Sequence, residues 1–481
     1  MESEKTNRQI DKSITGACFD NREGKCEKIF QILKAIFYLL SEQKENLYRK
    51  KTKSRQREAN MHKYSVRGNI IFTSGRDKFE IYDDAYLNIE GGRVVSVSKE
   101  NLFEDVVSYV GKLIIPGFVD THVHAPQINN TGLGYDEELL AWLEKYTFPE
   151  EAKYIDEDFA EKSYGNFVNR LLENGTTSSV IFGTIYKDTT LLLAKMMEQK
   201  GLKAYIGKVN MDRNSPDFYI EETEKSIEET EAFIEALSDF KNIRPIITPR
   251  FVPSCTERLM KKLGDLAEKY DVKIQSHLSE SISETDWVRS LHPECKNYLD
   301  VYVRHLAVRE NFHTVMAHCV WLTNEEKEVM KSRGILVSHC PYSNANLASG
   351  IAPVREMMSR GIDVSLGSDV SGGSEFFIGK IIGMAQMLSK MYFVHVDGSQ
   401  EPLTIPELFY MATKGGGKFF GKVGSFEAGY AADFLVIDDT SIQDIHPRTT
   451  QERLERFLFT GDKHHIAKVY VNGTEIKGGS L

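Results

Sequence analysis

The sequence predicts an α/β fold, a (β/α)8 TIM-like barrel with a small β-sandwich domain built from both ends of the body. Eight apolar, strand-like runs alternate with helical stretches in the middle of the chain. This alternation is typical of parallel βα units, and eight is the number of strands that closes such a barrel. Strand-rich segments stand on either side of the middle. The length of 481 residues accommodates a barrel and a smaller domain.

The first 60 residues differ from the rest in charge. They hold 14 Lys and Arg against 9 Asp and Glu, whereas the whole chain has a net charge of −10. We expect residues 1–60 to form a basic, partly helical or disordered extension, with an apolar helical stripe at 27–48 and a basic run at 49–57. Such a run is usually a solvated linker. The alternative is a membrane-surface or nucleic-acid contact.

The β-domain is expected to come from two separate segments, 61–112 and 424–481. Both consist of short strand patterns divided by polar and glycine-containing turns. The expected strands are 65–73, 80–90, 93–98 and 112–115 in the first segment, and 433–437 and 465–471 in the second.

The barrel is expected to span residues 113–423. Helical stretches such as 189–200, 221–240 and 257–270 separate its apolar runs. The expected barrel strands are 114–121, 177–183, 203–209, 243–248, 272–277, 314–318, 335–339 and 363–367.

Composition narrows the class of protein. An acidic balance argues against a dedicated nucleic-acid binder, which needs a basic face. The apolar runs are shorter than the roughly 18–20 residues of a membrane span, and Glu2, Glu4 and Asp11 argue against a secretory or transit peptide. Six cysteines without C-x-x-C spacing favour a reduced, cytoplasmic setting.

Several metal-binding residue types fall at strand ends. His122 and His124 close the first barrel strand as H-x-H, and strand geometry puts both on one face. His277 and His318 end the fifth and sixth strands, and Asp369 follows the eighth. Because these ends meet at the mouth of a barrel, the side chains should converge. The set suits zinc first, with iron or manganese as alternatives; two packed histidines alone would indicate little.

Glu280 follows His277 by three residues and is a candidate proton shuttle. Its carboxylate can return near the metal along the loop, and burial can move a glutamate pKa toward neutral. The alternative is an ordinary glutamate at a helix start.

These residues carry a family resemblance. Segments 116–124, 277–280, 338–341 and 367–369, together with His318, resemble the amidohydrolase superfamily with a single metal. H-V-H-A-P-Q from His122, L-A-W-L-E-K-Y-T-F-P from Leu140 and T-P-R-F from Thr248 resemble the guanine deaminases within it. The resemblance runs from about residue 64 to the end and leaves out residues 1–60.

The resemblance implies the hydrolysis of guanine with water to xanthine and ammonia, by a cytosolic homodimer with one Zn²⁺ per subunit. It implies metal ligands at His122, His124, His277 and Asp369. It implies catalytic roles for Glu280, Asp369 and His318, with His318 holding the attacking water or the substrate. The implied substrate-binding residues are His124, Gln127, Trp142, Arg250, Phe251, His277, Glu280, His318 and Asp369.

The pocket residues fit guanine physically. Arg250 can only donate, so it suits the O6 acceptor and disfavours the 6-amino group of adenine. Gln127 can donate and accept, while Trp142 and Phe251 offer ring faces for stacking. The alternatives are core packing for the aromatic residues and an ordinary ion pair for Arg250.

Three rival functions stay open. The first is a related amidohydrolase that deaminates another heterocycle, such as 8-oxoguanine, adenine or a triazine. The second is a catalytically inactive amidohydrolase-like scaffold. The third is a bifunctional enzyme whose basic segment 1–60 binds a membrane or nucleic acid.

A chain that starts at Met61 should keep the fold and the catalysis, because the sequence pattern after this residue is complete without the basic segment. Circular dichroism and turnover of the truncated and full chains measure this. Loss of either property in the truncated chain contradicts the prediction.

Overall fold

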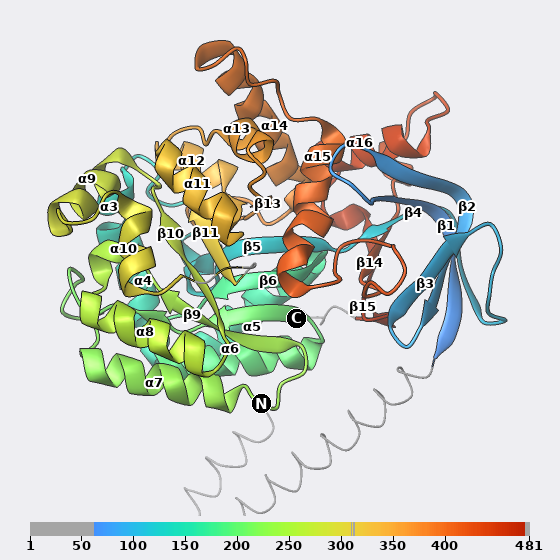
Figure 1. Cartoon of the computed structure of the whole chain (residues 1–481). Helices are drawn as coiled ribbons and strands as arrows, with labels where there is room; N and C mark the ends of the chain where they lie inside the picture. The colour runs from blue at the N-terminus through green and yellow to red at the C-terminus, as the bar shows by residue number, and fades with distance from the viewer. Residues whose placement is uncertain (1–61, 309, 311–312, 477–481) are drawn as a thin grey trace, which may run out of the picture. The chain divides into compact units, whose positions relative to one another are not determined.

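The computed structural model describes residues 62–308, 310 and 313–476. The predicted helix at 27–48, the basic run at 49–57 and Met61 lie outside the described residues. Within 62–476 the fold class is confirmed: a parallel barrel stands beside a separate mixed sheet (Figure 1). The division of the chain at residues 60, 112 and 423 stays a prediction.

The barrel strands are all parallel and follow one another in chain order around the ring. A short strand, β8 (Val209–Asn210), pairs with β9 beside this path. The eight strands of the path are β5 (Phe118–His124), β6 (Thr176–Phe182), β7 (Lys203–Gly207), β9 (Ile243–Pro249), β10 (Lys273–Leu278), β11 (Thr314–His318), β12 (Leu336–His339) and β13 (Val364–Leu366).

The ring closes between β5 and β13 through side chains and the residues just after the strands. The Thr121 hydroxyl lies 2.7 Å from the Ser365 hydroxyl and donates to the Leu366 carbonyl at 3.0 Å. The Asp369 N–H donates to the His122 carbonyl at 2.9 Å. Closure therefore brings the end of the first strand and the loop after the last strand together.

Amphipathic helices cover the barrel. In α8 the buried residues recur at helical spacing, and Thr256 caps the first turn by accepting from the Leu259 N–H. The principal helices are α5 (Glu157–Glu173), α6 (Lys187–Lys200), α7 (Thr223–Ala236), α8 (Glu257–Lys269), α9 (Ile282–Leu291), α10 (Tyr298–His305), α11 (Asn324–Arg333), α12 (Pro341–Asn346), α13 (Val354–Ser359), α14 (Ile378–His395), α15 (Ile405–Tyr410) and α16 (Thr450–Thr460), and the short α3 (Leu139–Trp142) and α4 (Phe148–Glu151) follow β5.

The second body takes strands from both ends of the described chain, as expected. The β-sandwich of the prediction has the form of one seven-stranded mixed sheet in the order β16-β15-β14-β4-β1-β2-β3. The two ends meet where β14 runs antiparallel to β4, the red and blue strands in Figure 1. Its strands are β1 (Lys63–Thr73), β2 (Phe79–Glu90), β3 (Arg93–Ser98), β4 (Val106–Pro116), β14 (Phe434–Ile437), β15 (Ile466–Val471) and β16 (Thr474–Glu475).

One strand prediction was wrong in its bounds. The expected strand at 114–121 is divided at Gly117, so that β4 ends in the sheet and β5 begins in the barrel. The Gly117 N–H donates to the Asp433 carbonyl at 3.0 Å. A Cβ at residue 117 would overlap the side chain of Thr177, so only glycine permits this crossing. Because the residues on both sides of Gly117 are apolar, the sequence does not show where the chain passes from the sheet to the barrel.

A buried ion pair joins the two bodies. Lys203, at the start of β7, donates from Nζ to both carboxylate oxygens of Asp433 at 2.8 and 2.6 Å. Asp433 precedes β14, its side chain is fully buried, and it also accepts from the Asn472 N–H at 2.7 Å. The pair fixes the barrel against the sheet.

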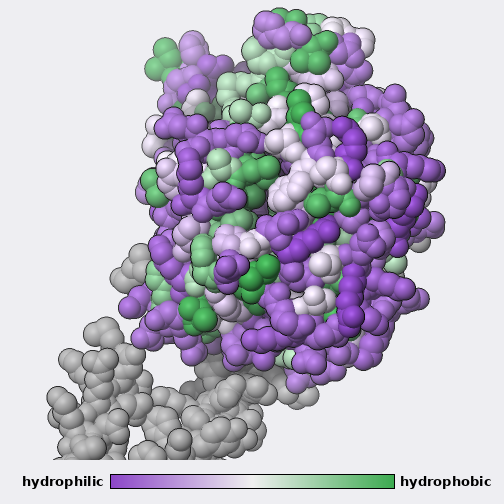
Figure 2. Space-filling model, turned by 90° about the vertical axis from the view of Figure 1, so that its left-hand side faces the viewer, coloured by the Kyte–Doolittle hydropathy of each residue, from purple (hydrophilic) through white to green (hydrophobic). Residues whose placement is uncertain are grey.

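Within residues 62–476, none of the described helices is both long and apolar enough to cross a bilayer. On the face shown in Figure 2, hydrophilic residues predominate and hydrophobic residues form small separate groups.

Replacing Lys203 with alanine should lower the free energy of unfolding by about 3–5 kcal/mol, because Asp433 is left as an unpaired buried charge. Thermal or urea unfolding measures the change. Lys225→Ala is the matched control, since its 3.7 Å pair with Glu229 is exposed on the lysine side. Equal effects of the two substitutions would contradict the role of the pair.

Candidate active site

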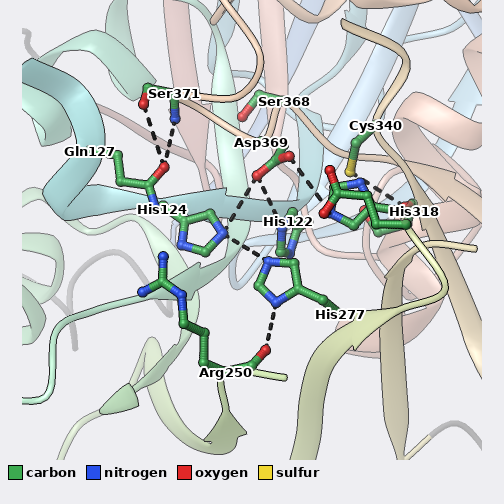
Figure 3. Close-up of polar contacts among 12 residues, drawn as sticks. His122, His124, Gln127, Arg250, His277, His318, Cys340, Ser368, Asp369 and Ser371 are labelled. Carbon is green, nitrogen blue, oxygen red and sulfur yellow. Dashed lines mark hydrogen bonds and ion pairs between the residues drawn. The ribbon is translucent and has the colours of Figure 1, made fainter. Parts of the chain in front are cut away.

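Five side chains converge at the carboxyl ends of the barrel strands (Figure 3). Four of them are buried and His277 is half-buried, and their polar atoms point toward one another. They are His122 and His124 from β5, His277 from β10, His318 from β11, and Asp369, which follows β13. The predicted convergence is therefore present.

The distances at the centre are short. Nε2 of His122 lies 3.1 Å from Oδ1 of Asp369, and Nε2 of His124 lies 3.5 Å from the same oxygen. Nε2 of His124 and Nε2 of His277 are 3.1 Å apart. Two neutral imidazoles at this distance share one proton between them or face a common cation.

Hydrogen bonds behind the cluster fix two of the rings. His277 Nδ1–H donates to the carbonyl oxygen of Arg250 at 2.6 Å. His318 Nδ1 lies 2.9 Å from Oδ1 of Asn344 and donates to it. With the proton held on Nδ1, each ring turns an Nε2 lone pair toward the centre, which is the usual support of a metal-ligating histidine.

The protonation states suit a metal site. Burial holds the pKa of His122, His124 and His277 below the ordinary value, so these rings stay neutral. Burial opposes ionisation of Asp369, but the adjacent His122, together with His318 and His124, outweighs it and the pKa of the carboxyl is lowered. Neutral imidazoles and an ionised carboxylate are the forms that bind a metal ion.

Two unpaired nitrogen atoms support the same conclusion. Among the described residues, the buried Nε2 atoms of His122 and His318 lie 3.1 Å from Asp369 Oδ1 and 3.3 Å from Glu280 Oε2, but neither contact has the geometry of a hydrogen bond. Buried polar groups are rarely left in this condition unless something else satisfies them. Three or four imidazoles and one carboxylate are a good donor set for zinc and related ions, so the residues present fit a metal.

Cys340 also approaches His122, His318 and Asp369. Its thiol donates to the Ser338 carbonyl at 3.4 Å, and burial raises the pKa of the thiol well above the ordinary value. The raised pKa favours a protonated thiol, which suits a packing residue better than a metal ligand.

The backbone at the site adopts an uncommon conformation. Ser279, His318 and Asp369 have φ values of 50°, 70° and 49°, in the left-handed region that side chains other than glycine disfavour. Residues held in this way cluster at functional sites, where the surrounding structure offsets the strain.

Glu280 lies beside the metal-type cluster. Its Oε2 is 3.3 Å from His318 Nε2, and its Oε1 accepts from the Ser349 hydroxyl at 3.2 Å. Burial, with the negative charges of Asp369 and Glu284, raises the pKa of Glu280 well above the ordinary value. These surroundings favour the protonated form of Glu280 and the ionised form of Asp369.

The helix-start role weighed for Glu280 belongs to Glu284. Ser281 caps α9, and Glu284 completes the capping box. One oxygen of Glu284 accepts from the Glu280 N–H at 2.8 Å and the other from the Tyr298 hydroxyl at 2.7 Å. The sequence analysis missed Glu284, although Ser-x-x-Glu after His277 was the signal for it.

A small cavity, partly open to solvent, adjoins the cluster. Trp142 is buried, its indole N–H donates to the Leu133 carbonyl at 2.9 Å, and Phe251 packs edge-on against Trp287. Both rings are therefore core residues and cavity walls at once. All of the predicted substrate-binding residues line this cavity. The lining residues are His124, Gln127, Leu139, Trp142, Leu143, Arg250, Phe251, His277, Glu280, Glu284, His318, Ser343, Leu347, Asp369 and Gly372.

Arg250 forms an ion pair, the alternative role considered for it, at the edge of the cavity. It lines the cavity, and it forms a two-pronged ion pair with Glu151 through Nη1 at 2.6 Å and Nη2 at 3.1 Å. Gln127 donates to the same carboxylate at 2.7 Å. Glu151 was missed because nothing in the sequence distinguishes it from the neighbouring Glu150.

A second group of metal-type side chains, formed by His292, Glu294, Cys295 and His305, does not fit a cation. Arg213 can only donate, and its Nη2 lies 2.9 Å from Nε2 of His292. Nε2 must therefore accept, and the proton of the neutral ring sits on Nδ1, which lies 3.4 Å from Glu294.

Comparison with known proteins places this site in a family. The model of the amidohydrolase family matches residues 113–476. Guanine deaminase from Dictyostelium discoideum is 38% identical over 442 residues, which cover 85% of this chain and 97% of the relative. Guanine deaminase from Escherichia coli strain K12 is 35% identical, with 76% and 84% covered.

A solved structure agrees with these relatives. The guanine deaminase of C. acetobutylicum, described with guanine bound in its active site, superposes with a TM-score of 0.84 at 44% identity. The match covers 86% of this chain and all of that one. On the matched family model, the similarity of these relatives and the shared fold, the chain belongs to the guanine deaminases of the amidohydrolase family.

Proposed function

We propose that this protein hydrolyses guanine to xanthine and ammonia. The observation that carries the proposal is the pairing, in one cavity, of a metal-type donor cluster and a buried acid, Glu280, with the donor groups of Arg250 and Gln127. The relatives named above are guanine deaminases, which supports the same substrate.

We assign one Zn²⁺ per subunit to His122, His124, His277 and Asp369. The neutral rings and the ionised carboxylate support this set, and iron or manganese would suit the same donors. When bound, such an ion supplies Lewis acidity and lowers the pKa of a water molecule so that hydroxide is available near neutral pH.

Asp369 and Glu280 divide the proton transfers. Asp369 is the anion and accepts the proton of the attacking water, which adds to C2 of guanine. The raised pKa of Glu280 favours its protonated form, so it first protonates the ring nitrogen next to C2. It then takes up the proton of the new C2 hydroxyl and passes it to the departing amine, and the proton on Asp369 returns to Glu280 at the end. His318, 3.3 Å from Glu280, holds the attacking oxygen in line. The two carboxyl groups act differently because their surroundings hold their pKa values apart.

The other side of the cavity selects the base. Arg250 donates to O6 of guanine, where adenine carries an amine that also donates. Gln127 forms hydrogen bonds to the neighbouring ring edge, and Trp142 and Phe251 pack against the ring faces. This pattern favours guanine over adenine.

We further propose a cytoplasmic homodimer. The resemblance to the family supports both statements, and the four described cysteines, all free, agree with a reducing compartment.

Zinc-loaded protein given guanine should release xanthine and ammonia in equal amounts, and a chelator should abolish turnover until zinc is restored. Ultraviolet absorbance and an ammonia assay measure the products. Adenine should react at least ~10⁴-fold more slowly, because its amine leaves buried donors of Arg250 unpaired. An inactive zinc-loaded protein, or one that prefers adenine, contradicts the proposal.

Glu280→Gln should keep the metal and the affinity for guanine while kcat falls by roughly 10²–10⁴-fold, since only proton transfer is lost. Metal analysis, guanine titration and steady-state kinetics separate these quantities. Glu294→Gln, at an exposed position outside the cavity, is the matched control and should behave as the wild type. A near-normal kcat for the Glu280 variant would contradict the proposed role of Glu280 as a proton shuttle.

A further inference from the structure

We infer that Glu151 is a positioning residue that sets the purine specificity of the site by fixing the side chains of Arg250 and Gln127. Glu151 is the last residue of α4 and is fully buried. It lies behind the cavity and is absent from its lining. The inference rests on the proposed function, since it concerns how guanine is recognised.

Four donors converge on the Glu151 carboxylate. Oε1 accepts from Gln127 Nε2 at 2.7 Å and from Arg250 Nη2 at 3.1 Å. Oε2 accepts from Arg250 Nη1 at 2.6 Å and from the Tyr219 hydroxyl at 2.8 Å. A carboxylate offers about four lone-pair sites, so these contacts occupy it completely. Glu151 therefore acts through other residues and does not bind the substrate itself.

The carboxylate decides which way the Gln127 amide faces. Because Glu151 only accepts, the Gln127 group next to it must be Nε2. The opposite oxygen, Oε1, accepts from the Ser371 N–H at 3.2 Å (Figure 3). A reversed amide would set oxygen against oxygen and N–H against N–H. Guanine therefore meets Gln127 in one fixed pattern of donor and acceptor.

Arg250 is fixed in the same way. Glu151 uses two of its five N–H groups, and the Phe148 ring lies 5.0 Å from the guanidinium carbon. The remaining donors are thereby held in one direction for the O6 acceptor. The Arg250 carbonyl also accepts from Nδ1 of His277. Arg250 therefore carries the proposed donors to the purine on its side chain and orients a proposed metal ligand through its backbone.

The ion pair also sets the charge of the pocket. Arg250 would otherwise place an unbalanced cation against the base, and a buried cation attracts anions. With Glu151 bound to it through two hydrogen bonds, the pair is neutral overall while keeping directed donors. Such a pocket suits a neutral purine.

The test is a double-mutant cycle on the zinc-loaded full chain. Glu151→Gln should raise KM for guanine by about 10- to 100-fold, because directed donors to the base are lost, and should leave kcat within about threefold. In an Arg250→Met background the same substitution should change KM by less than about threefold, because its effect runs through Arg250.

The matched control is Glu150→Gln. Glu150 is adjacent in sequence, but it accepts from Asn129 and Lys153 and does not line the cavity. This variant should keep the wild-type KM. Tyr219→Phe removes one of the four donors and should raise KM by less than Glu151→Gln, and Glu151→Asp, which keeps the charge, should restore part of the affinity.

A lower kcat with unchanged KM in Glu151→Gln, or an equal penalty with and without Arg250, would overturn the inference. Thermal unfolding will show whether Glu151→Gln folds. If it does not, the KM values of Tyr219→Phe and Glu151→Asp are compared with that of the wild type, and unchanged KM values would overturn the inference. Failure of the proposed function is a separate result, because the wild type itself would then not deaminate guanine.

Discussion

The burial of mutually close polar atoms at the barrel mouth is the constraint on which the site depends. Imidazole nitrogens and a carboxylate lie 3.1–3.5 Å apart with little access to water. Such groups are costly to bury unless hydrogen bonds or a cation satisfy them. The surrounding structure supplies acceptors on the outer side, the Arg250 carbonyl for His277 Nδ1–H and the Asn344 amide oxygen for His318 Nδ1–H, and leaves the inner side for the proposed metal ion.

Barrel closure contributes to the same constraint. Asp120, beneath the site, accepts from the backbone N–H of His122 at 3.2 Å and of Ser368 at 3.0 Å. This contact joins the first strand to the loop that carries Asp369. The metal-type cluster therefore forms only when the ring closes, so the fold and the site form together.

Much of this arrangement follows from the sequence. Apolar runs predicted the strands, and His122, His124, His277, His318 and Asp369 at their ends predicted the cluster, because parallel strand ends must share one face of the barrel. The division at Gly117 was hidden, since a strand that leaves a sheet and one that enters a barrel are equally apolar. Residues 1–60 were distinguished from the rest of the chain by their net positive charge alone.

The supporting residues were not predictable in the same way. Glu151 binds Arg250, which lies far along the chain, and a buried glutamate looks like a surface glutamate when only its neighbours in the chain are known. Glu284 differs, because its capping box was visible in the sequence. For residues that were predicted, such as Arg250, the sequence left two alternative roles open. Arg250 and Trp142 line the cavity and also make structural contacts, because a pocket wall in a close-packed protein is also part of its core.

The location of a bound ion tests the central claim most directly. Crystals of zinc-loaded protein, measured at the zinc absorption edge, should show one strong anomalous peak per chain within about 2.0–2.2 Å of His122, His124, His277 and Asp369. The ring nitrogens at the peak should be the Nε2 atoms. A peak elsewhere, or an empty cluster in protein that turns over guanine, would contradict the account.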